Sequence, residues 1–255
     1  MINIELQILL PPFIAGLLVL STHVPFGREV LSRGIIFIDL AIAQIAGLGV
    51  IVAFSIGVHD AWQVQLAAAF ASLLGAVALY WSERVWPDVQ EAVIGVAFVI
   101  ASSSSLLLIA NHPQGSEHLR EILVGQILWV DYAELVPVAA LYAVVLLLRR
   151  YFSAHGSRLP FYLLFAVTIT ASVQLVGVYL VFASLIMPAL AVHRIRPQLQ
   201  LPIAYLVGVF AYLAGMLLAS ALDLPAGPMI VLVLGVSSLL LLISQHKPSL
   251  KFEGE

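Results

Sequence analysis

Two polar side chains stand out because they lie within an apolar stretch that is long enough to cross a lipid bilayer. They are Asp39 and Gln44, and the stretch covers residues 34–56. An ionisable side chain is costly inside a membrane segment, and a protein that keeps one usually has water, a partner or a substrate beside it. We therefore predict that Asp39 lines a path for a cation.

The geometry of a regular helix separates these two side chains. Gln44 lies about 140° around the helix from Asp39, at about 3.6 residues per turn, so both point into one narrow pore only where the helix is distorted. The alternative for Gln44 is an interhelical hydrogen bond. The alternative for Asp39 is a structural pair with Arg33 or with a backbone group near the inner interface.

His23 and Glu91 are weaker candidates for contact with a cation. They lie at the inner ends of the first and fourth predicted membrane crossings. Imidazole and carboxylate groups both bind divalent metals, but a single such residue at the end of a membrane segment is more often an interfacial polar group. We expect either residue to contribute only where packing brings it close to Asp39.

A predicted external loop at about 111–131 carries four further groups that could bind a cation. They are His112, Glu117, His118 and Glu121. The functional interpretation is that they collect cations at the outer mouth or meet a binding protein. The alternative is an ordinary solvated loop.

The most basic internal loop, at about 149–160, is the candidate docking surface for a cytoplasmic partner. Its residues with this predicted role are Arg149, Arg150, His155, Gly156 and Arg158. A short helix ended by Gly156 fits the loop, because glycine is the usual residue just past a helix end. The alternative is an anchor of the positive-inside kind, in which basic residues hold a loop on the cytoplasmic side.

The elements that position these residues are membrane helices. The chain is 62% hydrophobic and 10% charged, with a mean hydropathy of +1.08, whereas soluble domains are about a quarter charged. These values predict an all-α, polytopic transmembrane helical bundle. A net charge of −3 leaves no nucleic-acid footprint.

The residues that are missing exclude several functions. Cysteine is absent, so any metal contact uses His, carboxylate, amide or backbone oxygen, which suits transient passage better than a tight site. The sequence contains no G-x-x-x-x-G-K-[ST] motif, so the chain is not itself a P-loop ATPase. It also lacks H-E-x-x-H and G-x-S-x-G motifs, and we expect no catalytic residues, no enzymatic activity and no permanently bound cofactor.

We predict about nine crossings, taking about 17–25 residues as a full span, in a single domain over 1–255 without a linker. Gly177 is the predicted reversal point between the short sixth and seventh segments, and the alternative is one long helix over 161–192. With the N-terminus outside and the C-terminus inside, every one of the 11 Lys and Arg except Arg120 falls on the inner side, as the positive-inside rule requires. The predicted crossings are 6–24, 34–56, 62–81, 91–110, 132–148, 161–176, 178–192, 201–222 and 228–244.

Five stretches along the chain carry a resemblance to a known family. The most specific are the glycine-led apolar segment 177–191, which includes Pro188-Ala, and the turn Asp223-Leu-Pro-Ala-Gly227 one helix later. The others are 33–39, 91–96 and 123–128. The sequence resembles the membrane permease subunits of bacterial ABC importers for zinc, manganese and iron, in which these stretches follow one another in the same order.

The resemblance implies a set of partners and a location. Two permease copies would pack around one pathway in the inner membrane, two cytoplasmic ATP-binding subunits would dock on the internal loops and use ATP, and an external metal-binding protein would deliver the ion. The family commonly has Asp-Ala-x-Ser-His at the opening stretch. Here Asp39 is kept, but Ala43 stands at the His position and Ile42 at the Ser position.

The resemblance therefore implies a half-site whose remaining ligands come from other helices, from the second subunit or from water. The alternative function is an ATP-independent cation channel or secondary carrier. The sequence does not distinguish between zinc, manganese and iron as the transported ion.

Overall fold

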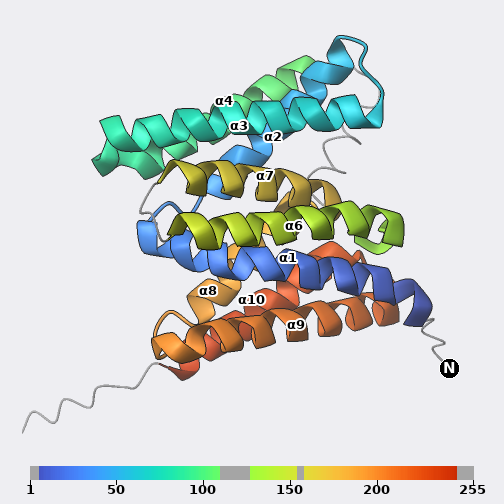
Figure 1. Cartoon of the computed structure of the whole chain (residues 1–255). Helices are drawn as coiled ribbons and strands as arrows, with labels where there is room; N and C mark the ends of the chain where they lie inside the picture. Colours follow the sequence, from blue (N-terminus) through green and yellow to red (C-terminus); the bar gives the residue numbers. More distant parts are fainter. Residues whose placement is uncertain (1–5, 110–126, 154–157, 246–255) are drawn as a thin grey trace, which may run out of the picture.

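The computed structural model describes residues 6–109, 127–153 and 158–245, and within these ranges the regular structure is helical throughout (Figure 1). The predicted all-α membrane bundle is confirmed, because eight of the described helices are long and apolar enough to cross a membrane and α8 is a shorter apolar helix. The elements are α1 (Leu6–Arg33), α2 (Ile38–Ser55), α3 (Ala61–Val85), η1 (Pro87–Val89), α4 (Gln90–Ile109), η2 (Ile127–Trp129), α6 (Tyr132–Ser153), α7 (Leu159–Val176), α8 (Val178–Ala191), α9 (Pro197–Leu222) and α10 (Ala226–Ser244).

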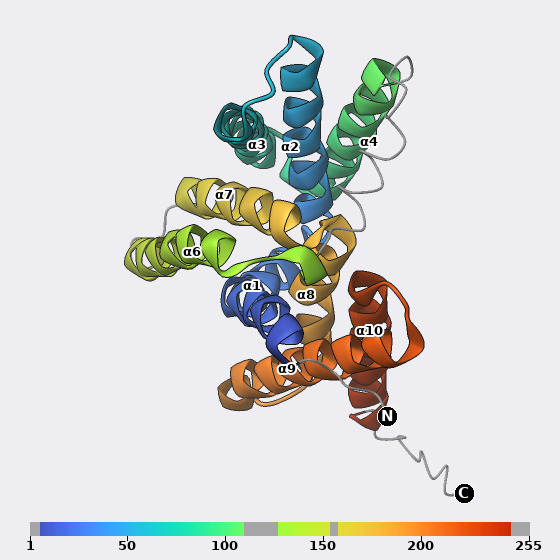
Figure 2. The ribbon, with the colours of Figure 1, turned by 90° about the vertical axis from the view of Figure 1, so that its right-hand side faces the viewer.

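The helices form two outer groups around a middle group. Helices α2, α3 and α4 pack on one another at one side, and α9 packs on α10 at the other (Figures 1 and 2). Between them, α1 contacts α6, α8 and α9, while α7 contacts α3 and α6. Helix α8 lies inside this arrangement, in contact with α1 and α10.

Helix α1 is longer than the sequence indicated, since it continues to Arg33 instead of ending near residue 24. The extension survives Pro25 because packing supports it: Phe26 and Val30 are buried. Glu29 also pairs with Arg33 one turn later, at 2.7 Å, which is the favourable i,i+4 spacing on a helix.

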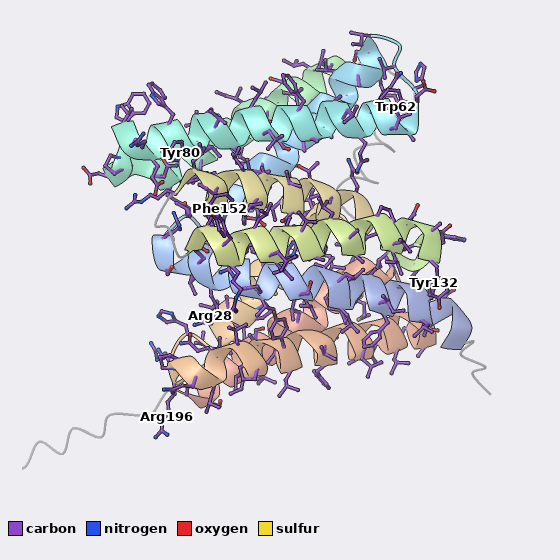
Figure 3. All side chains as sticks on the ribbon, viewed as in Figure 1. Arg28, Trp62, Tyr80, Tyr132, Phe152 and Arg196 are labelled. Carbon is purple, nitrogen blue, oxygen red and sulfur yellow. The ribbon has the colours of Figure 1, made fainter. Side chains whose placement is uncertain are left out.

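The arginines that the structure describes gather at one end of the bundle, here called the basic end. Figure 3 shows Arg28, Tyr80, Phe152 and Arg196 at this end, and Trp62 and Tyr132 at the opposite end. The other described arginines adjoin these positions: Arg33 ends α1, Arg84 lies near the end of α3, Arg149 and Arg150 lie in the last turns of α6, and Arg158 and Arg194 precede α7 and α9.

Gly177 separates α7 from α8, so the prediction of two short segments is confirmed and a single helix over 161–192 is wrong. Its backbone has φ 83° and ψ 160°, a region that is essentially restricted to glycine. The chain enters α7 just after Phe152 and leaves α8 just before Arg196, both at the basic end (Figure 3). Helix α8 has 14 residues, or about 21 Å, which is less than the roughly 30 Å of a hydrocarbon core.

Replacing Gly177 with alanine is expected to destabilise the fold by about 1–3 kcal/mol, because a Cβ makes this backbone conformation strained. Thermal unfolding of the detergent-purified protein measures the effect. The matched control is Gly95→Ala in α4, where an added Cβ meets nothing within 4 Å. Equal melting temperatures for the two variants would contradict the assignment of Gly177 as the hinge between α7 and α8.

A candidate cation site at the start of α2

Asp39 lies in the first turn of α2, which follows Phe37 as N-cap residue. Its side chain is 1% exposed, and neither carboxylate oxygen has a hydrogen-bond partner among the described residues. The free amide groups of a helix N-terminus favour a negative charge there, but burial of an unpaired carboxylate remains costly. The Asp39 carboxylate is therefore a candidate for contact with a positively charged partner.

That partner is not Arg33, which was the structural alternative for Asp39. The Arg33 guanidinium contacts the Glu29 carboxylate at 2.7 Å, and it lies 4.2 Å from the centre of the Phe161 ring. Both contacts hold it on the α1 and α7 side of the connection. Arg33 thus stabilises the end of α1 and leaves the Asp39 carboxylate unpaired.

Glu91 supplies a second carboxylate at the same place. It lies in the first turn of α4, and its Oε1 accepts a hydrogen bond from the backbone N–H of Phe37 at 3.2 Å. Its Oε2 is buried without a hydrogen-bond partner among the described residues. The hydrogen bond places Glu91 beside Phe37, two positions before Asp39, so packing brings two of the four sequence-based candidates to the start of α2.

His23 lies elsewhere in the bundle. It shares a face of α1 with Gly16 and Gly27, and these two glycines lie against Tyr212 of α9 and the Leu185 carbonyl of α8. The imidazole is fully buried, with Nδ1 2.9 Å from the Val19 carbonyl and Nε2 unpartnered among the described residues. Helix α2 instead packs against α3, α4, α7 and α8, so we do not include His23 in the site.

Gln44 faces a different space from Asp39, as helical geometry predicts. It is 7% exposed and lines a cavity of about 480 Å³ together with Ser102 and Tyr179, whereas Asp39 is not in the lining. The cavity lies between α2, α4, α8 and α10, which Figure 2 shows along one side of the molecule. No hydrogen bond joins Gln44 to another helix within the described ranges, so the interhelical bond proposed as its alternative is not seen.

Among the described residues, no group of three or more His, Asp or Glu side chains could hold a metal ion. Within the described ranges, the start of α2 therefore offers the carboxylates of Asp39 and Glu91 as candidate ligands. Carboxylate oxygens bind divalent cations, and a site with few protein ligands releases its ion readily. The arrangement suits passage of a cation better than its storage.

Comparison with known proteins decides the family. The sequence profile of the ABC 3 transport family matches residues 5–156 and 152–246. The chain belongs to the ABC 3 transport family.

Relatives of this family member have names that refer to different metals. The chain is 29% identical over 224 residues to the chelated iron transport system membrane protein YfeD of Yersinia pestis, and the match covers 80% of this chain and 74% of that protein. It is 22% identical over 247 residues to the high-affinity zinc uptake system membrane protein ZnuB of Haemophilus influenzae, covering 89% and 93%. It is 25% identical over 228 residues to the manganese transport system membrane protein MntC of Halalkalibacterium halodurans, covering 81% and 77%.

A solved structure supports the fold of this ABC 3 family member. The chain is similar to one in the structure of PsaBC from Streptococcus pneumoniae in complex with a Fab, with a TM-score of 0.71 and 22% sequence identity. The match covers 92% of this chain and 90% of that chain. The helical arrangement is therefore one that a chain of this solved complex also adopts.

The residues predicted to dock a partner have different environments in this ABC 3 family member. Arg149 is half-buried and ties α6 to α1, since its guanidinium donates to the Pro25 carbonyl at 3.2 Å and to Glu29 at 3.3 Å. Arg158 has a side chain that is 64% exposed and pairs with Glu83 at 3.2 Å. Arg150 is exposed, so Arg150 and Arg158 are more accessible to a partner than Arg149.

The remaining predicted residues lie outside the described ranges. These are His112, Glu117, His118 and Glu121 of the external loop and His155 and Gly156 of the internal loop. Sequence reasoning also missed Glu29, the acid that joins α1 to α6. Its signal was the four-residue spacing from Arg33, which is the spacing of helical ion pairs.

Proposed function

We propose that the chain is the permease subunit of an ATP-driven importer for a divalent transition metal, which is zinc, manganese or iron. Separate cytoplasmic ATP-binding subunits hydrolyse ATP, and an external metal-binding protein delivers the ion. Two copies of this single-domain chain form the pathway in the inner membrane. Family membership, the metals in the names of its relatives and the absence of a Walker motif in the sequence support this assignment.

The proposed orientation has the basic end in the cytoplasm, the N-terminus outside and the C-terminus inside. It is supported by the described arginines, which lie together at one end (Figure 3), because cytoplasmic loops of membrane proteins carry an excess of Lys and Arg. In this orientation Arg150 and Arg158 are available to the ATP-binding subunits. Asp39 then lies toward the inner end of the pathway.

The observation that carries the proposal is the buried Asp39 carboxylate, whose two oxygens have no partner in the described structure. In the transport cycle, Asp39 contacts the ion and Glu91 adds a second oxygen ligand, while water or the second copy completes the coordination. A pathway must bind its ion strongly enough to admit it and weakly enough to release it. A pair of carboxylates with few further protein ligands meets both conditions.

Helix α8 is in a position to transmit movement to this site. The ring of Phe37, which precedes α2, stacks on Phe182 of α8 with 6.2 Å between centroids and an interplanar angle of 8°. Phe37 also donates its backbone N–H to Glu91. When ATP binding in the partner subunits shifts α8, the connection that holds both carboxylates shifts with it.

Metal uptake in cells that lack their own transporter tests the function. Cells that express the chain with its ATP-binding and metal-binding partners are expected to accumulate radioactive zinc, manganese or iron, and competition between the three metals identifies the substrate. Accumulation is expected to stop when the ATP-binding subunit cannot hydrolyse ATP. Uptake that continues without this subunit would instead support the ATP-independent channel or carrier.

A further inference from the structure

A polar cavity lies at the basic end, away from Asp39. It has a volume of about 450 Å³ and is formed by the last turns of α1 and α6, the end of α8 and the beginning of α9. Its polar lining consists of Arg28, Glu29, Ser32, Arg149, His193 and Gln200. We call this cavity the Arg28 pocket.

The charges in the Arg28 pocket do not cancel. The Glu29 carboxylate is already neutralised by Arg33 at 2.7 Å and by Arg149 at 3.3 Å. Arg28 is half-buried and has no hydrogen-bond or ion-pair partner in the part of the chain that the structure describes. A guanidinium left in this state is suited to a phosphate, because its planar fork can donate two parallel hydrogen bonds to phosphate oxygens.

Two leucines of α1 are exposed on the same stripe of the helix as Arg28. At about 3.6 residues per turn, Leu10, Leu17 and Arg28 point in the same direction around the axis of α1 to within about 20°. Leu10 is 49% and Leu17 is 37% exposed, although α1 is flanked by α6 and α9 (Figure 1). From Leu17 to Arg28 the helix rises about 16 Å, close to half of the roughly 30 Å hydrocarbon core. Val24 between them is fully buried, so α1 is exposed at the two ends of this interval and covered in its middle.

We propose that the Arg28 pocket binds the phosphate headgroup of an anionic membrane phospholipid, whose acyl chains lie in the surrounding bilayer. Arg28 is the main phosphate ligand, and the exposed His193 imidazole adds a donor at the rim. Basic pockets between membrane helices on the cytoplasmic side are typical binding sites for anionic headgroups. The site does not depend on Asp39 or on the transported metal.

Lipid retention measured by native mass spectrometry tests this proposal. The full-length protein is taken from nanodiscs that contain equal amounts of phosphatidylglycerol and phosphatidylcholine. The wild type is expected to retain phosphatidylglycerol preferentially. Arg28→Gln is expected to lower that retention about fivefold, which is the contribution of one basic residue near an anionic membrane surface. The double variant Arg28→Gln with His193→Gln is expected to lower it further.

Two controls isolate the role of the pocket. Arg28→Lys keeps the charge but not the planar fork, and it is expected to retain more phosphatidylglycerol than Arg28→Gln and less than the wild type. Arg196→Gln removes an exposed charge at the same end that does not line the pocket, and it is expected to behave as the wild type. Addition of inorganic phosphate at millimolar concentration is expected to leave the lipid bound, because free phosphate lacks the acyl chain.

Three results would overturn the proposal. The first is equal retention of the two lipids by the wild type, a result that does not require any variant to fold. The second is unchanged phosphatidylglycerol in Arg28→Gln, and the third is displacement of the lipid by free phosphate. If Arg28→Gln loses its ATP-binding subunit on purification while its lipid content is unchanged, the pocket is a protein contact instead.

Discussion

Replacing Asp39 with alanine is expected to reduce metal uptake about a hundredfold or more, to the background of cells without the transporter. The variant loses the buried carboxylate whose two oxygens are free to meet the ion. Loss of even a supporting group around a metal typically costs 10–100-fold, and Asp39 is proposed to contact the ion directly. Uptake of radioactive zinc, manganese and iron into cells that express the complete transporter measures the effect.

Asp39→Asn is the matched variant that separates transport from folding. It keeps the size of the side chain and removes the charge, so it is expected to lose uptake as Asp39→Ala does. Its melting temperature is expected to equal or exceed that of the wild type, because burial of an unpaired carboxylate opposes folding. Co-purification with the ATP-binding subunit is expected to be unchanged, and wild-type uptake by either variant would remove Asp39 from the pathway.

Glu91 variants distinguish a ligand from a residue that only positions the start of α2. Glu91→Gln removes the charge but keeps an oxygen that can accept the Phe37 N–H, whereas Glu91→Ala removes both. If Glu91 contacts the ion, both variants weaken the apparent affinity for metal. If it only holds Phe37, Glu91→Gln transports as the wild type and Glu91→Ala alone fails.

Replacing Gly27 with alanine is expected to destabilise the bundle by about 1–3 kcal/mol, as overpacking of a close-packed interior does. A Cβ at Gly27 would collide with the backbone carbonyl of Leu185, where α1 and α8 cross. A carbonyl in a helix cannot rotate away as a flexible side chain can, so α1 and α8 must separate. Thermal unfolding in detergent and the yield of folded protein measure the loss.

Gly95→Ala is the control for this change as well. Gly95 lies in α4 and an added Cβ there meets nothing within 4 Å, so the intrinsic preference of alanine for helix is expected to leave stability equal or slightly raised. The two variants differ in environment and not in chemistry. A Gly27→Ala protein that is as stable as Gly95→Ala would show that α1 and α8 are not in close contact in the membrane.

Much of the fold could be predicted because lipid acts on each segment separately. A bilayer requires about 20 apolar residues for every spanning helix and internal satisfaction of every backbone polar group, so the lengths of the apolar runs indicate where helices lie. The break at Gly177 was also local, since its φ of 83° is a conformation that glycine adopts without strain. The end of α1 was missed because the burial of Phe26 and Val30 and the contact of Glu29 with α6 depend on other helices. The spacing of Glu29 from Arg33 was the one local signal, and it was overlooked.

The sequence by itself determined that this is a helical membrane protein, that it lacks the motif for binding ATP, and that Asp39 is costly enough to need a partner. Only the tertiary structure decided which residues lie beside Asp39. Glu91 reaches Phe37 although 54 positions separate them, whereas His23 faces α8 and α9. The physical reason is that hydropathy sets the position of each helix along the membrane normal, while close contacts such as Gly27 on Leu185 set the rotations and neighbours that bring side chains together.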